Sequence, residues 1–258
     1  MRLYLKYFAM HLKSQMQYKT SFFFTTLGQF LVSFATFLSI SFLFARFDSV
    51  GGFAYEEVLI CFAAIITAFS LAELFGRGFD RFPALIGNGG FDRILVRPRG
   101  AVFQVLASQI DFSRMGRFVQ AILIFAYALP RGGIAWTPDK ITVLVLMIVC
   151  GALLFFGLFV VYASISFFTL EGLEFMNILT NGAREHGRLP FSVYGDEVLR
   201  FLTYVVPIAL IQYYPLLYLL GRETSLFYAA SPVLALWFLI PCNIFFRFGL
   251  RRYRSTGS

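Results

Sequence analysis

The side chains best suited to acid–base catalysis or metal binding are few in this sequence and lie far apart. The two histidines, His11 and His186, are separated by most of the chain. A metal site inside a membrane would need several histidines and carboxylates to converge. Glu171 and Glu174 have no such partners, and the adjacent Glu56-Glu57 pair is explained as favourable negative charge at a helix N-terminus. The sequence therefore predicts no catalytic, metal-binding or cofactor-binding residues.

Nucleotide binding and disulfide formation are not indicated either. The sequence has no Gly-x-x-x-x-Gly-Lys-Ser/Thr segment, whose backbone amides would hold phosphate groups. Cys61, Cys150 and Cys242 each lie within an apolar run. That position is typical of small core side chains rather than of zinc ligands or disulfides. We therefore expect a chain that is not itself an enzyme.

The most informative polar segment is a stretch of about 40 residues, 76–116, between two apolar runs. The Asn-Gly-Gly sequence at 88–90 favours a tight turn, after which Asp92 can begin a short helix that Pro98 ends. The apolar face of this helix would consist of Phe91, Ile94 and Leu95. With its arginine neighbours, the segment is either a docking element for a partner protein or an ordinary interfacial loop.

A second polar group precedes the third apolar run. Asp111, Arg114 and Arg117 follow one another at intervals of three residues, so that neighbours can pair on one helix face. Two interpretations are open. The group is a polar gate at the inner mouth of a transport path, or it is the interfacial start of a helix whose arginines extend to the headgroups.

The composition identifies the setting of these segments. Apolar residues make up 59% of the 258 residues, aromatic residues 19% and charged residues only 14%, against about 25% charged in a soluble domain. A soluble fold of this size could not bury that much apolar surface, and a disordered chain would be far more polar. The sequence therefore predicts a polytopic membrane protein.

The apolar runs predict an all-α fold with six transmembrane helices and an N-terminal amphipathic helix at the membrane interface. The second run is long enough only if Glu73 lies at the inner interface. We expect an interfacial helix at 1–20, transmembrane helices at 22–46, 57–76, 112–130, 141–167, 200–221 and 225–246, a cytoplasmic loop at 77–111, and a further cytoplasmic segment at 168–199.

The distribution of basic residues predicts the orientation. With the N-terminus inside, only four of the 22 Lys and Arg residues fall outside, namely Arg46, Arg131, Lys140 and Arg222. Such a bias is the positive-inside pattern of a membrane protein, so the net charge of +8 does not indicate nucleic-acid binding. We expect a multi-pass protein of a bacterial inner membrane, surrounded by lipid, with both termini in the cytoplasm.

Several segments resemble those of a known family. Residues 86–98, with their glycine turn, Phe91-Asp92 and Leu95-Val-Arg97-Pro98, resemble the cytoplasmic loop of permease subunits of ABC type-2 exporters. The closest similarity is to the small bacterial six-span group that includes viologen-exporter and antibiotic-resistance permeases. Further similar segments are 189–194, 199–207, 213–215, 219–221 and 248–258. Gly195 departs from the pattern, because many relatives have a proline there.

The resemblance implies a transport subunit. Two permease chains, identical or different, would form the membrane core, and a dimer of separate ABC ATPase subunits would bind ATP and magnesium below it. The loop between spans two and three would contact the ATPase through Gly90, Phe91, Asp92, Arg93, Leu95, Arg97 and Pro98. ATP binding would then drive alternating access and the export of a hydrophobic or amphipathic substrate.

The resemblance also implies another layout for the C-terminal third. In that layout 170–186 is a short fifth span, 200–221 is a re-entrant pair of half-helices at the outer face, and the segment between them is external. Pro207 and Pro215 are compatible with such a broken helix. Hydropathy instead predicts one continuous span over 200–221, with 168–199 in the cytoplasm.

The main functional alternative is a secondary transporter without an ATPase. Such a protein uses membrane-buried acidic residues to couple ion flow to substrate movement, and it often contains inverted repeats. The first, fourth and sixth apolar runs carry no charge, which gives this alternative little support.

Overall fold

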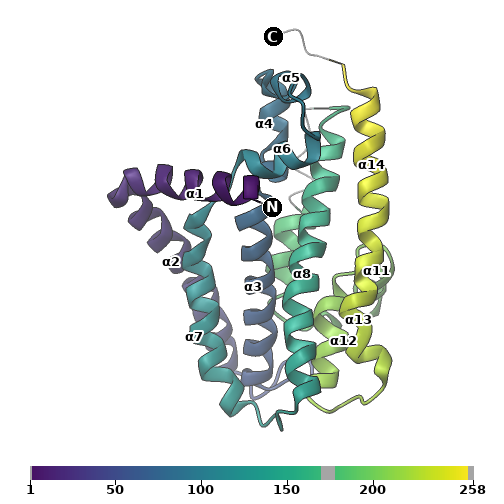
Figure 1. Cartoon of the computed structure of the whole chain (residues 1–258). Coiled ribbons are helices and arrows are strands. Elements are labelled where there is room, and N and C mark those ends of the chain that lie inside the picture. The colour runs from purple at the N-terminus through teal and green to yellow at the C-terminus, as the bar shows by residue number, and fades with distance from the viewer. Residues whose placement is uncertain (1, 170–177, 255–258) are drawn as a thin grey trace.

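The computed structural model describes residues 2–169 and 178–254, and over these residues the regular structure is helical (Figure 1). The first part of the predicted 168–199 segment, at 170–177, lies outside the described residues. Up to residue 169 the elements are α1 (Arg2–Gln17), α2 (Lys19–Phe44), α3 (Tyr55–Asp80), α4 (Phe82–Gly87), α5 (Gly90–Leu95), α6 (Ala101–Ser108), the 3-10 turn η1 (Phe112–Arg114), α7 (Met115–Arg131) and α8 (Pro138–Ile165). From residue 178 onward they are the π-helical turn η2 (Ile178–Gly182), α10 (Ala183–His186), the 3-10 turn η3 (Phe191–Tyr194), α11 (Asp196–Tyr204), α12 (Ala209–Leu219), α13 (Leu226–Leu234), the 3-10 turn η4 (Ala235–Phe238) and α14 (Leu239–Arg252).

The central element of the bundle is α3, which packs most extensively against α8 and α7. In the most apolar 18-residue stretch of the helical segment Tyr55–Gly87, which contains α3, 89% of the stretch is buried. The buried share of the corresponding stretch is 17% in α2 and 22% in the α13–α14 helix. Apolar helices with so little protein around them are stable only beside lipid or another apolar chain. α3 is therefore the core of the fold, and α2 and α14 form its periphery.

Four helices are long and apolar enough to cross a membrane, and the number rises to five if one bent pair counts as a span. The four are Lys19–Phe44, Tyr55–Gly87, Pro138–Ile165 and Leu226–Arg252. Helix α7 corresponds to the predicted third span and contains 17 residues. The prediction of an all-helical polytopic chain is confirmed, but six continuous spans are not found among the described residues.

The predicted continuous span over 200–221 is wrong. The segment forms two helices, α11 and α12, which meet at an angle of 112°. The break includes Pro207, which lacks an amide donor and keeps the preceding residue out of the helical conformation. Pro215 lies within α12 without ending it. Hydropathy over 200–221 could not reveal this bend, because the residues on both sides of the break, at 201–206 and 208–211, are largely apolar.

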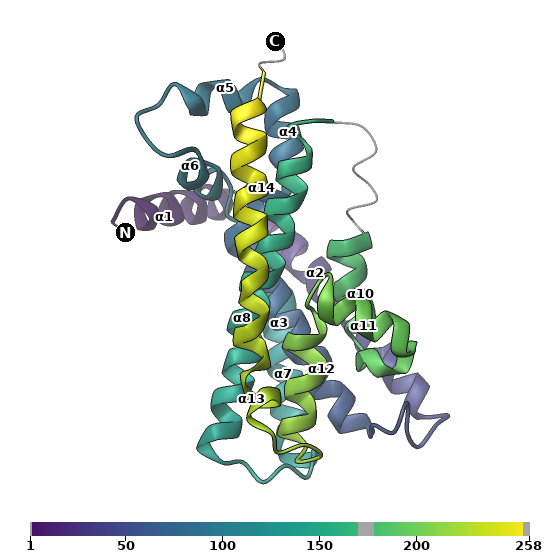
Figure 2. The same ribbon diagram turned by 90° about the vertical axis from the view of Figure 1, so that its right-hand side faces the viewer.

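The segment before α11 also differs from the layout predicted by hydropathy. Gly51, in the loop between α2 and α3, has a φ of +60°, and a Cβ atom there would lie 2.6 Å from Cγ2 of Val193. η3 is thus next to the loop that precedes α3. Figure 2 shows α11 and α12 in the half of the bundle away from α4 and α5. This geometry favours the layout in which the segment before α11 is external, while the orientation in the membrane stays a prediction.

Helix α1 lies beside one end of α3 and runs across its direction (Figure 1). Its Phe8 ring contacts Phe112 and Phe75, with ring centroids 4.8 and 6.3 Å apart. Leu5 and Met16 remain exposed. The helix therefore has one apolar surface on the protein and another available to lipid, as an interfacial helix requires.

The position of η3 gives a test of topology. In a background with the three native cysteines replaced by alanine, we expect the Asp196→Cys variant to react with a membrane-impermeant thiol reagent in intact cells. Asp196 is exposed at the start of α11, next to η3. Mass shift after labelling measures the reaction.

Two control positions, one expected outside and one expected in the cytoplasm, accompany this experiment. Thr137→Cys, at the turn before α8, should also react in intact cells, whereas Arg99→Cys, near α5, should react only after permeabilisation. If Asp196→Cys is protected in intact cells while both controls behave as stated, the segment before α11 is cytoplasmic and the external layout is wrong.

Candidate functional site

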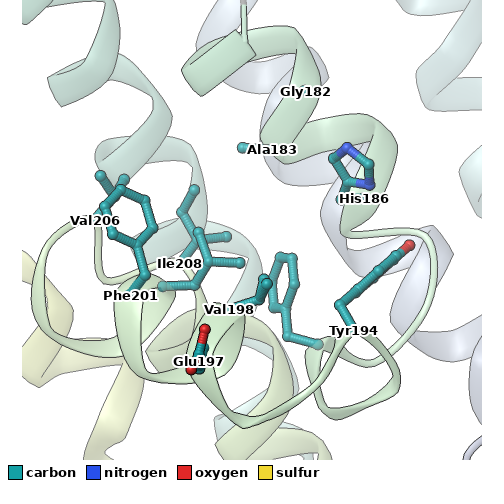
Figure 3. Close-up of a pocket in the computed structure, with 11 residues that line it drawn as sticks. Gly182, Ala183, His186, Tyr194, Glu197, Val198, Phe201, Val206 and Ile208 are labelled. Atoms are coloured by element: carbon teal, nitrogen blue, oxygen red, sulfur yellow. The ribbon is translucent and has the colours of Figure 1, made fainter.

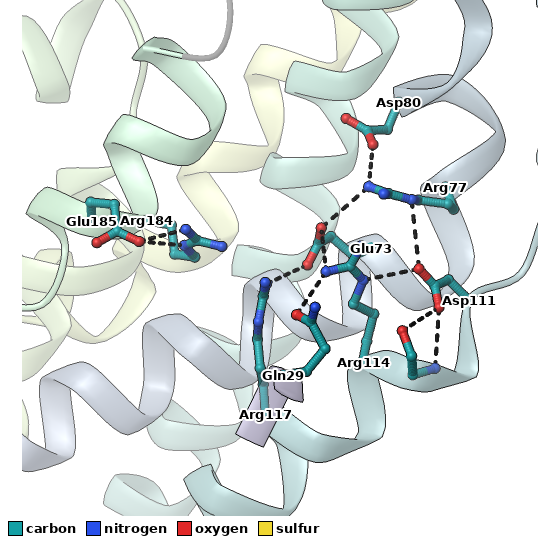
Figure 4. Close-up of polar contacts among 10 residues, drawn as sticks. Gln29, Glu73, Arg77, Asp80, Asp111, Arg114, Arg117, Arg184 and Glu185 are labelled. Carbon is teal, nitrogen blue, oxygen red and sulfur yellow. Dashed lines mark hydrogen bonds and ion pairs between the residues drawn. The ribbon is translucent and has the colours of Figure 1, made fainter. Parts of the chain in front are cut away.

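Glu73 is the centre of a buried cluster of charged side chains near the C-terminal end of α3 (Figure 4). Its Oε2 atom lies 2.7 Å from Nη1 of Arg117, and its Oε1 atom lies 3.4 Å from Nη1 of both Arg114 and Arg77. Glu73, Arg114 and Arg117 are each at least 92% buried. One carboxylate thus joins α3 to both η1 and α7.

Asp111 is the second acceptor of the cluster. It accepts hydrogen bonds from the backbone amide and the hydroxyl of Ser113, at 3.1 and 2.6 Å, and from Nε of Arg114 at 3.1 Å. Burial alone would raise the pKa of Asp111, but the Ser113 hydrogen bonds and the charges of Arg114 and Arg77 together hold it below its ordinary value. Asp111 is therefore ionised at neutral pH and caps η1.

Local sequence explains how these groups meet. Glu73 and Arg77 are one helical turn apart on α3. Gly116 lets α7 approach α2 closely, since a Cβ atom there would be 2.1 Å from the carbonyl oxygen of Thr26. On the α2 side, Gln29 accepts a hydrogen bond from Arg114 at 3.0 Å. The close contact between α2 and α7 thus brings a polar residue of α2 into the cluster.

The depth of the cluster follows from helix geometry. At about 1.5 Å per residue, Glu73 lies about 27 Å along α3 from Tyr55. A hydrocarbon core is about 30 Å thick. If α3 enters the membrane at its N-terminus, the cluster lies at the inner edge of the core, where the sequence places Glu73.

Of the three residues predicted to form one polar group, Asp111, Arg114 and Arg117, only the first two pair with each other. Asp111 and Arg114 do pair, as their spacing indicates, but Arg117 bonds to Glu73 and has no contact with Asp111. The sequence reasoning did not assign Glu73 and Arg77 to the site. A carboxylate within an apolar helix, followed by an arginine one turn later, was the available signal. That these residues form a gate stays a prediction.

The charged region continues towards the segment that begins at residue 178. Arg184 pairs with Glu185, and its guanidinium lies over the ring of Phe69 at 4.9 Å. Arg188 also pairs with Glu185. A small cavity of about 20 Å³ separates Arg184 and Arg188 from Arg117. The bundle therefore has basic side chains on both sides of a narrow internal space.

The predicted docking helix exists as α5, but its apolar face is not the predicted one. Phe91 is fully buried against Phe82, Phe167 and Tyr253, with ring centroids 4.9, 5.6 and 5.1 Å away. Gly90 and Ile94 are buried as well. Phe91 is thus a packing residue, and the prediction that Phe91 and Ile94 form an exposed apolar face is wrong. Asp92 also faces the fold, because it accepts a hydrogen bond from the Tyr253 hydroxyl at 3.0 Å.

The exposed part of this region lies slightly later in the sequence. Leu95 is 44% and Val96 83% exposed, although both are apolar. We define the α5 tip as the exposed residues Arg93, Leu95, Val96, Arg97 and Pro98. Gly89 makes this geometry possible, since its φ of +65° turns the chain between α4 and α5. Four of the seven predicted coupling residues, Arg93, Leu95, Arg97 and Pro98, therefore remain available to a partner.

A separate apolar cavity of about 520 Å³ lies beside the bent helix pair (Figure 3). Its polar groups are few, and they include the Glu197 carboxylate and the rings of His186 and Tyr194, which are 5.3 Å apart. The lining residues are Gly182, Ala183, His186, Phe191, Tyr194, Glu197, Val198, Phe201, Leu202, Val206 and Ile208. Such a cavity suits a hydrophobic molecule.

The structure predicts that Glu73 stabilises the fold through its ion pairs. Glu73→Gln removes the shared acceptor of three arginines, and breaking a buried ion pair costs about 3–5 kcal/mol. For a chain of this length we expect the melting temperature of the purified protein to fall by at least about 6 °C. Thermal unfolding followed by intrinsic fluorescence measures the change.

Two further variants make this test specific. Glu56→Gln makes the same chemical change at the solvent end of α3, where Glu56 has no ion pair within the described residues, and it should shift the melting temperature far less. Combining Glu73→Gln with Arg117→Met should recover part of the loss, because one unpaired buried charge is removed. Equal shifts for Glu73→Gln and Glu56→Gln would contradict the role of the cluster.

One protein family matches the part of the chain that contains the features described above. The family model described as ABC-2 family transporter protein matches residues 30–257, which include the Glu73 cluster, the α5 tip and the apolar cavity. No curated protein and no solved structure shows a significant match. The similarity noted in the sequence is thus confirmed across most of the chain. The chain belongs to the ABC-2 transporter family and is a permease of the ABC type-2 class.

Proposed function

We propose that the chain is the membrane subunit of an exporter driven by separate ABC ATPase subunits. The observation that carries this proposal is the α5 tip. Two exposed apolar side chains, Leu95 and Val96, stand among the arginines Arg93 and Arg97 on a segment that the rest of the fold does not cover. Apolar side chains with charged neighbours are typical of a protein-binding surface.

The connection of the α5 tip to the bundle supports a coupling role. The helical segment Tyr55–Gly87 has 33 residues, so that at about 1.5 Å per residue it extends roughly 50 Å. This exceeds a hydrocarbon core of about 30 Å and lets its last turns stand clear of the membrane. A displacement at the tip is thus passed to α3, and α3 carries Glu73. ATP and magnesium would be bound by the partner, and their binding would bias the permease between two conformations.

A second permease chain, identical or different, completes the proposed assembly. The weakly buried α2 and the α13–α14 helix provide apolar surfaces for such a chain as well as for lipid. The basic residues around the α5 tip favour the cytoplasmic side of a bacterial inner membrane for this end of the molecule. Both described chain ends, at Arg2 and Arg254, would then lie on or near the cytoplasmic face.

The apolar cavity supports a hydrophobic or amphipathic substrate. It is bordered by η3 and α11, in the half of the bundle away from the α5 tip. A molecule leaving the membrane core outward would meet this cavity before it reaches water. Glu197 and His186 at its border provide polar contacts for one end of an amphipathic molecule.

A secondary transporter without an ATPase is less compatible with the fold. Glu73 would be the natural residue to bind a coupling ion, because it is a carboxylate buried in the bundle. Both of its oxygens are already engaged by guanidinium groups from three arginines. A coupling cation would have to displace these contacts.

Co-purification tests the proposal directly. The chain is co-expressed with ABC ATPase subunits of the same genome and captured by a tag on the permease. We expect the ATPase to co-purify, and Leu95→Asp/Val96→Asp to abolish this, since losing each apolar contact costs roughly 1.5–3 kcal/mol. The isolated permease should hydrolyse no ATP.

A matched control is available on α6. Val102 is 49% exposed and lies outside the α5 tip, so Val102→Asp should leave co-purification unchanged. Phe91→Asp should instead lower the melting temperature, because it places a charge among the rings of Phe82, Phe167 and Tyr253. Undiminished ATPase capture by the Leu95→Asp/Val96→Asp variant would reject the tip as the docking surface, and ATP hydrolysis by the isolated chain would reject the proposed function.

Transport assays test the cavity. Val198→Trp places a larger side chain in the cavity, and we expect the ATP-dependent efflux of a lipophilic fluorescent dye to fall while ATPase capture persists. Tyr204→Trp, on the same helix but outside the cavity lining, is the control. Equal efflux by both variants and the unchanged protein would exclude this cavity from the substrate path.

A further inference from the structure

The corner between α1 and α2 encloses a third space, a polar cavity of about 450 Å³. It is bounded by three parts of the fold that are distant in sequence, namely the α1–α2 corner, the C-terminal end of α3 and the turn before η1. Its lining residues are Ser14, Gln15, Tyr18, Ser21, Phe22, Thr25, Gln29, Arg77, Arg81, Asp111, Ser113 and Arg114.

The unused hydrogen-bonding groups of this cavity are donors suited to an anion. Arg81 is exposed at its border and forms no ion pair within residues 2–169 and 178–254. The Nε atom of Arg77 is buried without a hydrogen-bond partner and lies 3.7 Å from Asp111. The hydroxyl groups of Tyr18 and Ser21 likewise make no hydrogen bond to the described part of the chain.

The carboxylates near the cavity do not cancel this donor surplus. Asp111 is the one carboxylate in the lining, and its oxygens already accept from Ser113 and Arg114. Asp80 and Glu73 neutralise Arg77 and Arg114 from the side of the cluster. The uncompensated positive charge of the site is therefore that of Arg81.

The position of the cavity matches the headgroup layer. At about 1.5 Å per residue, Arg77 and Arg81 lie about 33 and 39 Å along the helix axis from Tyr55, just beyond a hydrocarbon core of about 30 Å. Beside the cavity, Phe23 and Phe24 on α2 are 60% and 63% exposed. A lipid bound here would have its phosphate at the basic groups and its acyl chains along α2.

We propose that this cavity binds the phosphate headgroup of an anionic phospholipid. The guanidinium groups of Arg81 and Arg77 and the hydroxyls of Tyr18 and Ser21 supply the hydrogen bonds that phosphate oxygens require. The lipid joins the α1–α2 corner to the end of α3. Because Arg77 also contacts Glu73, lipid binding is linked to the charged cluster inside the bundle. This site does not depend on the identity of the exported substrate or on the ATPase.

Lipid titration of the full chain tests the proposal. Delipidated protein in detergent is titrated with phosphatidylglycerol, and bound lipid is counted by native mass spectrometry. We expect Arg81→Gln to weaken binding about tenfold, as the loss of one charge-assisted phosphate contact predicts. Ser21→Trp, which fills the cavity, should weaken it similarly. Arg247→Gln removes an exposed arginine of α14 outside the cavity and should leave binding unchanged.

Two further ligands identify the source of the phosphate. Phosphatidylcholine, whose headgroup has no net charge, should bind more weakly than phosphatidylglycerol, and millimolar inorganic phosphate should not displace phosphatidylglycerol. Equal binding of phosphatidylglycerol by Arg81→Gln, Arg247→Gln and the unchanged protein would overturn the site. Displacement by inorganic phosphate would overturn the lipid assignment.

Discussion

The arrangement of this bundle depends on how one buried carboxylate is neutralised. Glu73 would be prohibitively costly at its depth without partners, because the desolvation of an unpaired ion costs several kcal/mol. Its three arginines come from α3, η1 and α7, so the requirement for neutrality also fixes the relative positions of these elements. The Asp111 cap and the contact of Gln29 then attach the turn before α7 and the helix α2 to the same centre.

This polar centre sits on a helix that is otherwise the apolar core. From Val58 to Phe79 most side chains of α3 are buried, and α7 and α8 cover its two sides. Beyond the C-terminal end of α3, the chain continues through α4 to the α5 tip. Gly78 allows α6 to pack closely on α3, because a Cβ atom at this position would lie 1.9 Å from the carbonyl oxygen of Val105. α3 therefore passes through the core and the charged cluster, and α4 and the Gly89 turn connect it to the proposed docking surface.

Sequence reasoning was successful where one physical effect dominates. Long charge-free runs predicted α2 and α8, and the Asn-Gly-Gly turn predicted the start of α5. It failed where tertiary contacts decide. Phe91 looked exposed because its segment is polar, yet the aromatic side chains that cover it come from residues as distant as Tyr253. The bend between α11 and α12 lies within a largely apolar stretch, 201–219, so the mean hydropathy of this stretch resembled that of one continuous span. The depth of Glu73 was anticipated, but its ion pairs were missed, because Arg114 and Arg117 are more than 40 residues away in the sequence.

The packing of Phe91 has a consequence for biosynthesis. Its covering rings include Tyr253, and neighbouring Phe82 also contacts Phe246 of α14. Phe82 precedes Phe91 in the chain, but a ribosome makes Tyr253 long after α5, so the Tyr253 ring and its hydrogen bond to Asp92 are missing throughout most of translation. If the α5 tip recruits an ATPase, this surface acquires all of its native contacts only after Phe246 and Tyr253 have been synthesised and have packed against Phe82 and Phe91. In that case partly synthesised chains would compete poorly for the nucleotide-hydrolysing partner, because recruitment would depend on completion of the membrane bundle.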